Sequence, residues 1–247
     1  MSRVYLVNVG ANTRHSGRAR SPLFPDGSFK YVPFPQPGEL SRPCNAEAAK
    51  YFRDEIYAQE THDDPDWQNL TYGDNCRNGR AAALRRAEVG NVLLFWALLW
   101  EHCGCGAGWE GFTREHGWYF IGALRIEKIV EPGQCPQDDR AARCVHFEPG
   151  QPLGKDHRVF VGSERHSALF EKAVDLEVRR KDGLIYEIAR TAGGRRLNLT
   201  GKGSWRSSLR GCRAHWNLDA PEQRSRAETG AQAIRDVAGY DLFAPDA

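Results

Sequence analysis

The stretch "NVLLFWALLW" (91–100), taken with "WYFIGALRIEKIV" (118–130), decides the fold. The second segment alternates apolar and polar residues in its second half, which is the period of a half-buried β-strand. The first segment is too apolar for its period to separate strand from helix. Gly90 and Asn91 precede it and a glycine-rich loop follows it, and these breakers favour a buried strand. The sequence therefore predicts two core strands here.

The other elements follow from apolar runs and from helix-start signals. Four more extended segments are predicted, at residues 4–9, 27–35, 158–162 and 184–189. Three helices are predicted: 44–60 with Asn45 as N-cap, 163–178 entered through Ser163, and 219–239 opening with Pro221. Residues 61–91 are expected to form a long loop that is acidic at its start and basic at its end. Residues 132–157 are expected to form an insertion.

The chain shows no internal repeat and no linker long enough to divide it. With 247 residues, 40% of them hydrophobic, it is large enough to bury one core. We therefore expect a single domain over 1–247 of the α+β class. Its centre is expected to be a mixed β-sheet or a small β-barrel flanked by helices.

The net charge of +2 hides an uneven distribution. Residues 1–30 carry five Lys or Arg against one acid, 31–75 carry three against nine, and 179–226 carry twelve against four. Such clustering predicts a positively charged surface that binds anions. Of the cations, 27 are Arg, whose planar group grips phosphates. A high-GC genome is the alternative explanation for the arginine total, but it explains the clustering less well.

Several classes of protein are disfavoured. No apolar run reaches the ~20 residues of a membrane span, and the N-terminus lacks the order of a signal peptide. The seven irregularly spaced cysteines fit reduced thiols in the cytoplasm. The phosphate-binding, dinucleotide and zinc-deaminase signatures are absent, so we expect no cofactor. "HCGC" (102–105) with Cys135, Cys144 and His146 offers zinc ligands, but the spacing fits no usual pattern, so we predict no metal site.

The order of five segments resembles the third nucleotide-modification-associated domain family. They are "VYLVNVGANT" (4–13), "PDGSFKYVPFP" (25–35), "LTYGD" (70–74), "WYFIGALRIEKI" (118–129) and "FVGSERHSALFEKAV" (160–174). The resemblance covers about 4–180 and leaves 181–247 as a basic C-terminal extension. The two core strands also look like the sheet of PUA, ASCH and EVE-type domains, compact β-barrels that read or process modified bases. The resemblance implies work on modified nucleobases, usually in phage or in defence against phage.

The polar loop after the first strand is one candidate site. Asn12 offers an amide that can orient a water molecule or a base edge. His15, Arg18 and Arg20 are candidates for substrate binding, the arginines at phosphates. Loops on rigid scaffolds often carry sites. The alternative is a solvated turn with incidental arginines.

"LTYGDNCRNGR" (70–80) is the second candidate. Tyr72 would stack on a flipped base, Asp74 would polarise a water molecule, and Arg77 would bind phosphate. The alternative is a Gly-Asp turn closed by an Asx hydrogen bond. Asp26 in "PDGS" reads first as a turn aspartate and second as a catalytic carboxylate.

Two further segments are candidates for contacts with bases or backbone. Trp118 opens a core strand and would form an aromatic wall, with core packing as the alternative. Lys202 and Arg206 lie in a late segment (193–216) that mixes cations with tryptophans. That mixture suits a groove that follows a nucleic-acid backbone, or else a plain basic surface loop.

Together these features predict a DNA glycosylase in antiviral defence, which flips a modified base, hydroxymethylated or glucosylated, and hydrolyses its glycosidic bond. Asp74 is the predicted catalytic carboxylate, with Asn12 and Asp26 as further catalytic candidates. The expected partner is DNA carrying modified bases. Two alternatives stay open: a non-catalytic reader of modified bases and an enzyme of modified-base biosynthesis.

Overall fold

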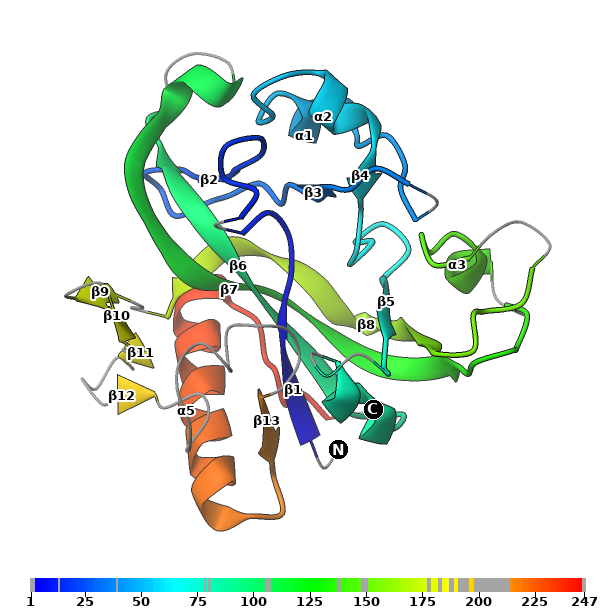
Figure 1. The fold of residues 1–247 in the computed structure, drawn as a ribbon. Coiled ribbons are helices and arrows are strands. Elements are labelled where there is room, and N and C mark those ends of the chain that lie inside the picture. The colour runs from blue at the N-terminus through cyan, green and yellow to red at the C-terminus, as the bar shows by residue number, and fades with distance from the viewer. Residues whose placement is uncertain are drawn as a thin grey trace.

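A seven-stranded sheet forms the centre of the molecule. The computed structural model describes residues 3–12, 14–38, 40–77, 79, 81–104, 108–136, 139–147, 151–176, 179–181, 184–186, 189–190, 196–197 and 214–245. The sheet contains β1 (Arg3–Asn8), β2 (Ser21–Leu23), β5 (Thr71–Asn75), β6 (Val92–His102), β7 (Phe112–Val130), β8 (His157–Asp175) and β13 (Ala214–Asn217). Its order is β13-β1-β6-β7-β8-β5, with β2 also paired to β6. Figure 1 shows it curled into a half-barrel around which the smaller elements lie.

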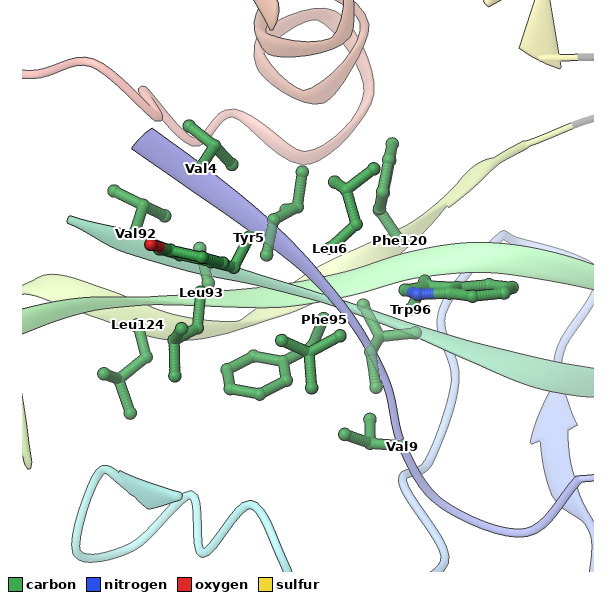
Figure 2. Packing of buried hydrophobic residues seen from close by; sticks show 14 of the residues in the cluster. Val4, Tyr5, Leu6, Val9, Val92, Leu93, Phe95, Trp96, Phe120 and Leu124 are labelled. Atoms are coloured by element: carbon green, nitrogen blue, oxygen red, sulfur yellow. The ribbon is translucent and has the colours of Figure 1, made fainter. Parts of the chain in front are cut away.

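The two predicted core strands are confirmed as β6 and β7, which pair antiparallel along most of their length. In β6 every residue except Glu101 is buried. A strand covered on both faces has no reason to alternate, which explains its continuous apolar sequence. β1 lies parallel to β6, and Figure 2 shows side chains of the two strands in one hydrophobic cluster, among them Leu6 and Phe95.

The helices are short apart from the last. The described residues include α1 (Ala46–Ala49), α2 (Ile56–Gln59), α3 (Asp139–Ala142) and α5 (Pro221–Ala238), with 3-10 turns η1 (Ala82–Arg86) and η2 (Gly108–Gly111). The predicted C-terminal helix is confirmed, with Pro221 in its first turn and Gly239 ending it in the left-handed conformation. Asn45 is confirmed as the N-cap of α1 through its bond from the Ala48 N–H. The single helix predicted over 44–60 is wrong, because α1 and α2 are separate single turns.

The helix predicted over 163–178 is also wrong, because residues up to Asp175 continue strand β8. β8 carries the predicted short strand 158–162 at its start, and it pairs with β7 both there and in its second half. The β7–β8 register shifts at three places along the ladder. Each irregularity interrupts strict alternation. In the second half of β8, apolar residues therefore recur at spacings like those of a helix.

Three small ribbons complete the described strands. β3 (Phe34–Pro35) pairs with β4 (Thr61–His62), which lies within the segment expected to be a loop. β9 (Arg179–Lys181) pairs with β10 (Leu184–Tyr186), and β11 (Ala189–Arg190) with β12 (Arg196–Leu197). The predicted α+β class is confirmed. Among the described helices, none has the length and hydrophobicity needed to cross a membrane.

Candidate functional site

The side chain of Asp64 is the centre of a buried polar cluster. Both of its carboxylate oxygens lie 3.1 Å from the backbone N–H of Gly73, which donates to them. The backbone carbonyl of Asp64 accepts a hydrogen bond of 2.7 Å from the Tyr31 hydroxyl. The Asp64 side chain is only 2% exposed, and this burial raises the pKa of its carboxyl group well above the ordinary value.

Two imidazoles face this carboxylate. Nε2 of His146 lies 3.2 Å from Asp64 Oδ2, and Nε2 of His62 lies 3.9 Å from the same oxygen. The two rings are nearly perpendicular, with centroids 5.0 Å apart. Burial lowers the pKa of both histidines, that of His146 to about 4, so both rings are neutral near pH 7. One potential ligand atom from each of the three residues lies within 4.8 Å of the other two.

All three residues of "YGD" (72–74) serve this cluster from strand β5. Gly73 donates to Asp64 and also makes room for His146, because a Cβ at residue 73 would stand 2.2 Å from His146 Cδ2. The Tyr72 hydroxyl donates a 2.8 Å hydrogen bond to Asp74 Oδ2. The charge of Asp74 in turn favours the protonated forms of His146 and His157.

The polar loop after β1 reaches the cluster through a row of rings. His15 stacks on Phe34 at 5.0 Å, and Phe34 contacts His62 at 5.1 Å between ring centroids. Asn12 folds this loop, since its Oδ1 accepts from the Arg14 N–H at 3.0 Å. Gly10, at φ +72°, lies so close to Tyr31 that a Cβ there would stand 3.0 Å from that ring. The loop that Asn12 folds is thus connected to His62 of the cluster through His15 and Phe34.

A pocket of about 690 Å³ lies next to the cluster and is lined by Asp63, the residue between His62 and Asp64. Burial, and then the charge of Asp66, raise the pKa of the Asp63 carboxyl to about 6. The pocket also presents cations and amides, which are Lys30, Arg42, Arg143, Asn45, Gln68 and Asn69. Asp66 lines it too and is held by bonds from the backbone N–H groups of Gln68 and Asn69.

The structure places the predicted arginines in different settings. The guanidinium of Arg20 lies 4.1 Å from the ring centroid of Trp100 and 4.7 Å from that of Trp109, so it is packed among rings at the tip of the β6–β7 hairpin. Arg18 lies over Tyr57 at 5.6 Å. Arg77 is 72% exposed and 3.5 Å from Asp156.

The predicted stacking rings are part of the core. Tyr72 is 5% exposed and packs on Phe95, and Trp118 is 7% exposed and packs on Trp96. Neither ring is presented to solvent for stacking on a base. Asp26 is a turn aspartate that accepts from the backbone N–H and hydroxyl of Ser28. Lys202 and Arg206 lie outside the described residues.

Among the zinc ligands considered between residues 102 and 146, those in the described part of the chain do not gather. Nε2 of His102 bonds the Gly108 carbonyl and its Nδ1 accepts from the Gly104 N–H. Cys103 is disulfide-bonded, which corrects the expectation that the thiols are reduced, whereas Cys44, Cys76, Cys135 and Cys144 are free. His146 instead joins His62 and Asp64. Sequence reasoning missed these two residues, although the spacing of His62 and Asp64 in "HDDPDW" (62–67) offered a signal.

Comparison with known proteins gives one match. The family model described as nucleotide modification associated domain 3 matches residues 3–225, which includes every residue of the cluster and of the pocket. No curated protein and no solved structure matches the chain. The expected likeness to PUA, ASCH and EVE-type barrels therefore stays a prediction.

Proposed function

Because the chain belongs to the nucleotide modification associated domain 3 family, we propose that it recognises a modified base in DNA and excises it by hydrolysing the glycosidic bond. The observation that carries this proposal is a carboxylate, Asp63, in a pocket of about 690 Å³ lined by cations and amides. Ligand pockets typically measure ~300–1,000 Å³, so the volume suits a nucleoside. We propose phage DNA as the substrate and the cytoplasm as the place of action.

The polar lining suits a flipped nucleotide. Lys30 and Arg143 are exposed at the pocket, which makes them available to phosphate oxygens. Arg42 is held in place by its bond to the Arg143 carbonyl and by Asp66 at 3.9 Å. The amides of Asn45 and Gln68 offer donors and acceptors for the edge of a base. Such a lining combines charge for the backbone with hydrogen bonds for the base.

The chemistry needs a carboxylate. Hydrolysis of a glycosidic bond passes through an oxocarbenium-like state, which a carboxylate stabilises while another or the same group directs water. Asp66 is committed to its hydrogen bonds with Gln68 and Asn69, and Glu47, the third carboxylate of the pocket lining, is paired with Lys50 at 2.7 Å. We therefore assign the reacting carboxylate to Asp63. Asp74, which the sequence favoured, does not line this pocket. It is the competing assignment for the reacting carboxylate.

The test uses the whole chain with unmodified, hydroxymethylated and glucosylated phage DNA. Released bases are identified by mass spectrometry, and abasic sites by cleavage with alkali. Wild-type protein is expected to release one modified base and leave alkali-labile sites. Asp63→Asn is expected to abolish release, and Asp26→Asn, at a surface turn, to retain it.

Three outcomes revise the proposal. Release lost in Asp74→Asn but kept in Asp63→Asn moves the carboxylate to Asp74. Intact DNA in every reaction, with a gel shift specific to one modification, overturns excision and makes the protein a reader. Transfer or trimming of a group on a base that stays attached to the sugar makes it a biosynthetic enzyme.

A further inference from the structure

We propose that His62, Asp64 and His146 bind one divalent transition-metal ion. Their potential ligand atoms lie within 4.8 Å of one another, and two of the three separations are 3.2 and 3.9 Å. Bonds of about 2.0–2.2 Å to zinc place the ligand atoms of a tetrahedral site roughly 3.3–3.6 Å apart. The observed spacing therefore needs only small side-chain movements to enclose an ion.

The hydrogen bond of His62 fixes which nitrogen faces Asp64. Nδ1 of His62 lies 2.9 Å from the carbonyl oxygen of Leu40, which can only accept, so Nδ1 carries the proton. In the neutral ring Nε2 then has a lone pair, and this nitrogen lies 3.9 Å from Asp64 Oδ2. A neutral imidazole nitrogen with a lone pair is the form of histidine that binds a metal ion.

The groups around the three ligands are those that a metal site needs. Metal-binding histidines usually donate their other N–H to a carbonyl or carboxylate, as His62 does to Leu40. Asp64 is oriented by the Gly73 N–H on its carboxylate and by the Tyr31 hydroxyl on its carbonyl. His62 and Asp64 are thus held by partners from separate parts of the chain before any ion arrives.

The donor set limits the choice of ion. Two imidazoles and one carboxylate suit zinc and ferrous iron, whereas calcium and magnesium prefer oxygen alone. Three protein ligands leave at least one coordination position for water or for a ligand. The cluster adjoins the pocket through Asp63, which lies between His62 and Asp64 in the chain. An ion here would therefore act as a Lewis acid close to the pocket.

The ion would also connect three segments. His62 belongs to β4, Asp64 to the segment that leads toward β5, and His146 to the segment after α3. Binding to the folded state alone raises the melting temperature in proportion to the logarithm of the metal concentration above Kd. This readout needs no substrate, so the metal site is tested separately from the proposed function.

The experiment measures metal content and stability of the full chain. Protein freed of metal is incubated with Zn²⁺, Mn²⁺ or, without oxygen, Fe²⁺, dialysed, and analysed by mass spectrometry for bound metal. We expect one equivalent per chain for Zn²⁺ or Fe²⁺ and a Tm that rises on addition and falls with chelator. Co²⁺ is expected to give visible ligand-field bands without a thiolate charge-transfer band, since the ligands are N and O.

Variants locate the ion. His62→Ala and His146→Ala are expected to weaken binding at least about 100-fold, because each loses a direct ligand. His116→Ala removes an exposed imidazole on β7 and is the matched control, expected to bind like wild type. Substoichiometric metal and an unchanged Tm in the wild-type protein overturn the proposal, even if the variants fail to fold. Wild-type binding by both ligand variants also overturns it.

Discussion

The imidazole of His146 lies directly against Gly73, so close that a methyl group on residue 73 would stand 2.2 Å from Cδ2 of the ring. Strand β5 therefore admits His146 only because residue 73 has no side chain. The same residue donates its N–H to Asp64, so one glycine positions two members of the cluster.

Gly73→Ala is expected to displace His146 and to lower the free energy of unfolding by about 1–3 kcal/mol through overpacking. Urea denaturation measures the change. Gly17→Ala is the matched control, because nothing lies within 4 Å of a Cβ at residue 17. Equal stability of the two variants would contradict the close contact.

Tyr31→Phe removes the hydroxyl that donates to the Asp64 carbonyl. Leaving that buried carbonyl unpaired is expected to cost about 1–3 kcal/mol of stability. We also expect slower base release, because the Asp64 backbone adjoins Asp63. Tyr240→Phe loses a similar bond, to the His166 carbonyl, far along the chain from the site. It should lose comparable stability while its base release equals that of wild type; slowed release in both variants would mean a general effect of instability.

Stability is expected to depend on pH through His15. Burial against Phe34, and then the charges of Arg14 and Arg18, lower the pKa of His15 from 6.5 to about 4. The unfolded chain binds this proton at a higher pH than the folded chain. The stabilising contribution is thus present above pH 6.5 and is lost as pH falls toward 4. An NMR titration measures the pKa of His15. His15→Gln should flatten the pH dependence of Tm in this window. An unchanged profile would mean that other groups cause the pH dependence.

Arg20→Lys is expected to lower stability by about 0.5–2 kcal/mol, because a lysine ammonium does not reproduce the planar stacking on Trp100 and Trp109. Thermal unfolding measures this loss. Arg114→Lys, at an exposed position of β7, is the control. If Arg20 instead binds phosphate as the sequence analysis expected, the variant will lose DNA affinity without losing stability.

Local patterns predicted the elements that are locally determined. The cap at Asn45 and the start of α5 at Pro221 depend on adjacent residues alone, and both are confirmed. The apolar run of β6 identifies a strand because Gly90 and Asn91 precede it and a glycine-rich loop follows it. The second half of β8 differs from the predicted helix because irregular pairing with β7 removes the alternation that identifies a strand. That irregularity is a property of the sheet and not of the segment.

The site was predictable only where a single segment carries it. "YGD" pointed to the correct strand, and the loop around Asn12 to the correct region. His62 and His146, however, are separated by most of a hundred residues and meet only through tertiary folding. A histidine far from its partner has no local signature. Tyr72 is the opposite case, because its place in the motif suggests an exposed ring but the ring is buried in the core.

The pairing of β1 on both sides has a consequence for biosynthesis. Val4 lies opposite Val92 on one side and opposite Trp216 on the other, so β1 receives its outer neighbour from a strand far later in the chain. A nascent chain on the ribosome holds β1 with an open edge until β13 emerges. Such long-range contacts slow folding, and an unpaired edge invites association with other chains. We therefore expect C-terminal truncations that remove β13 to aggregate during synthesis, whereas the full chain closes that edge itself.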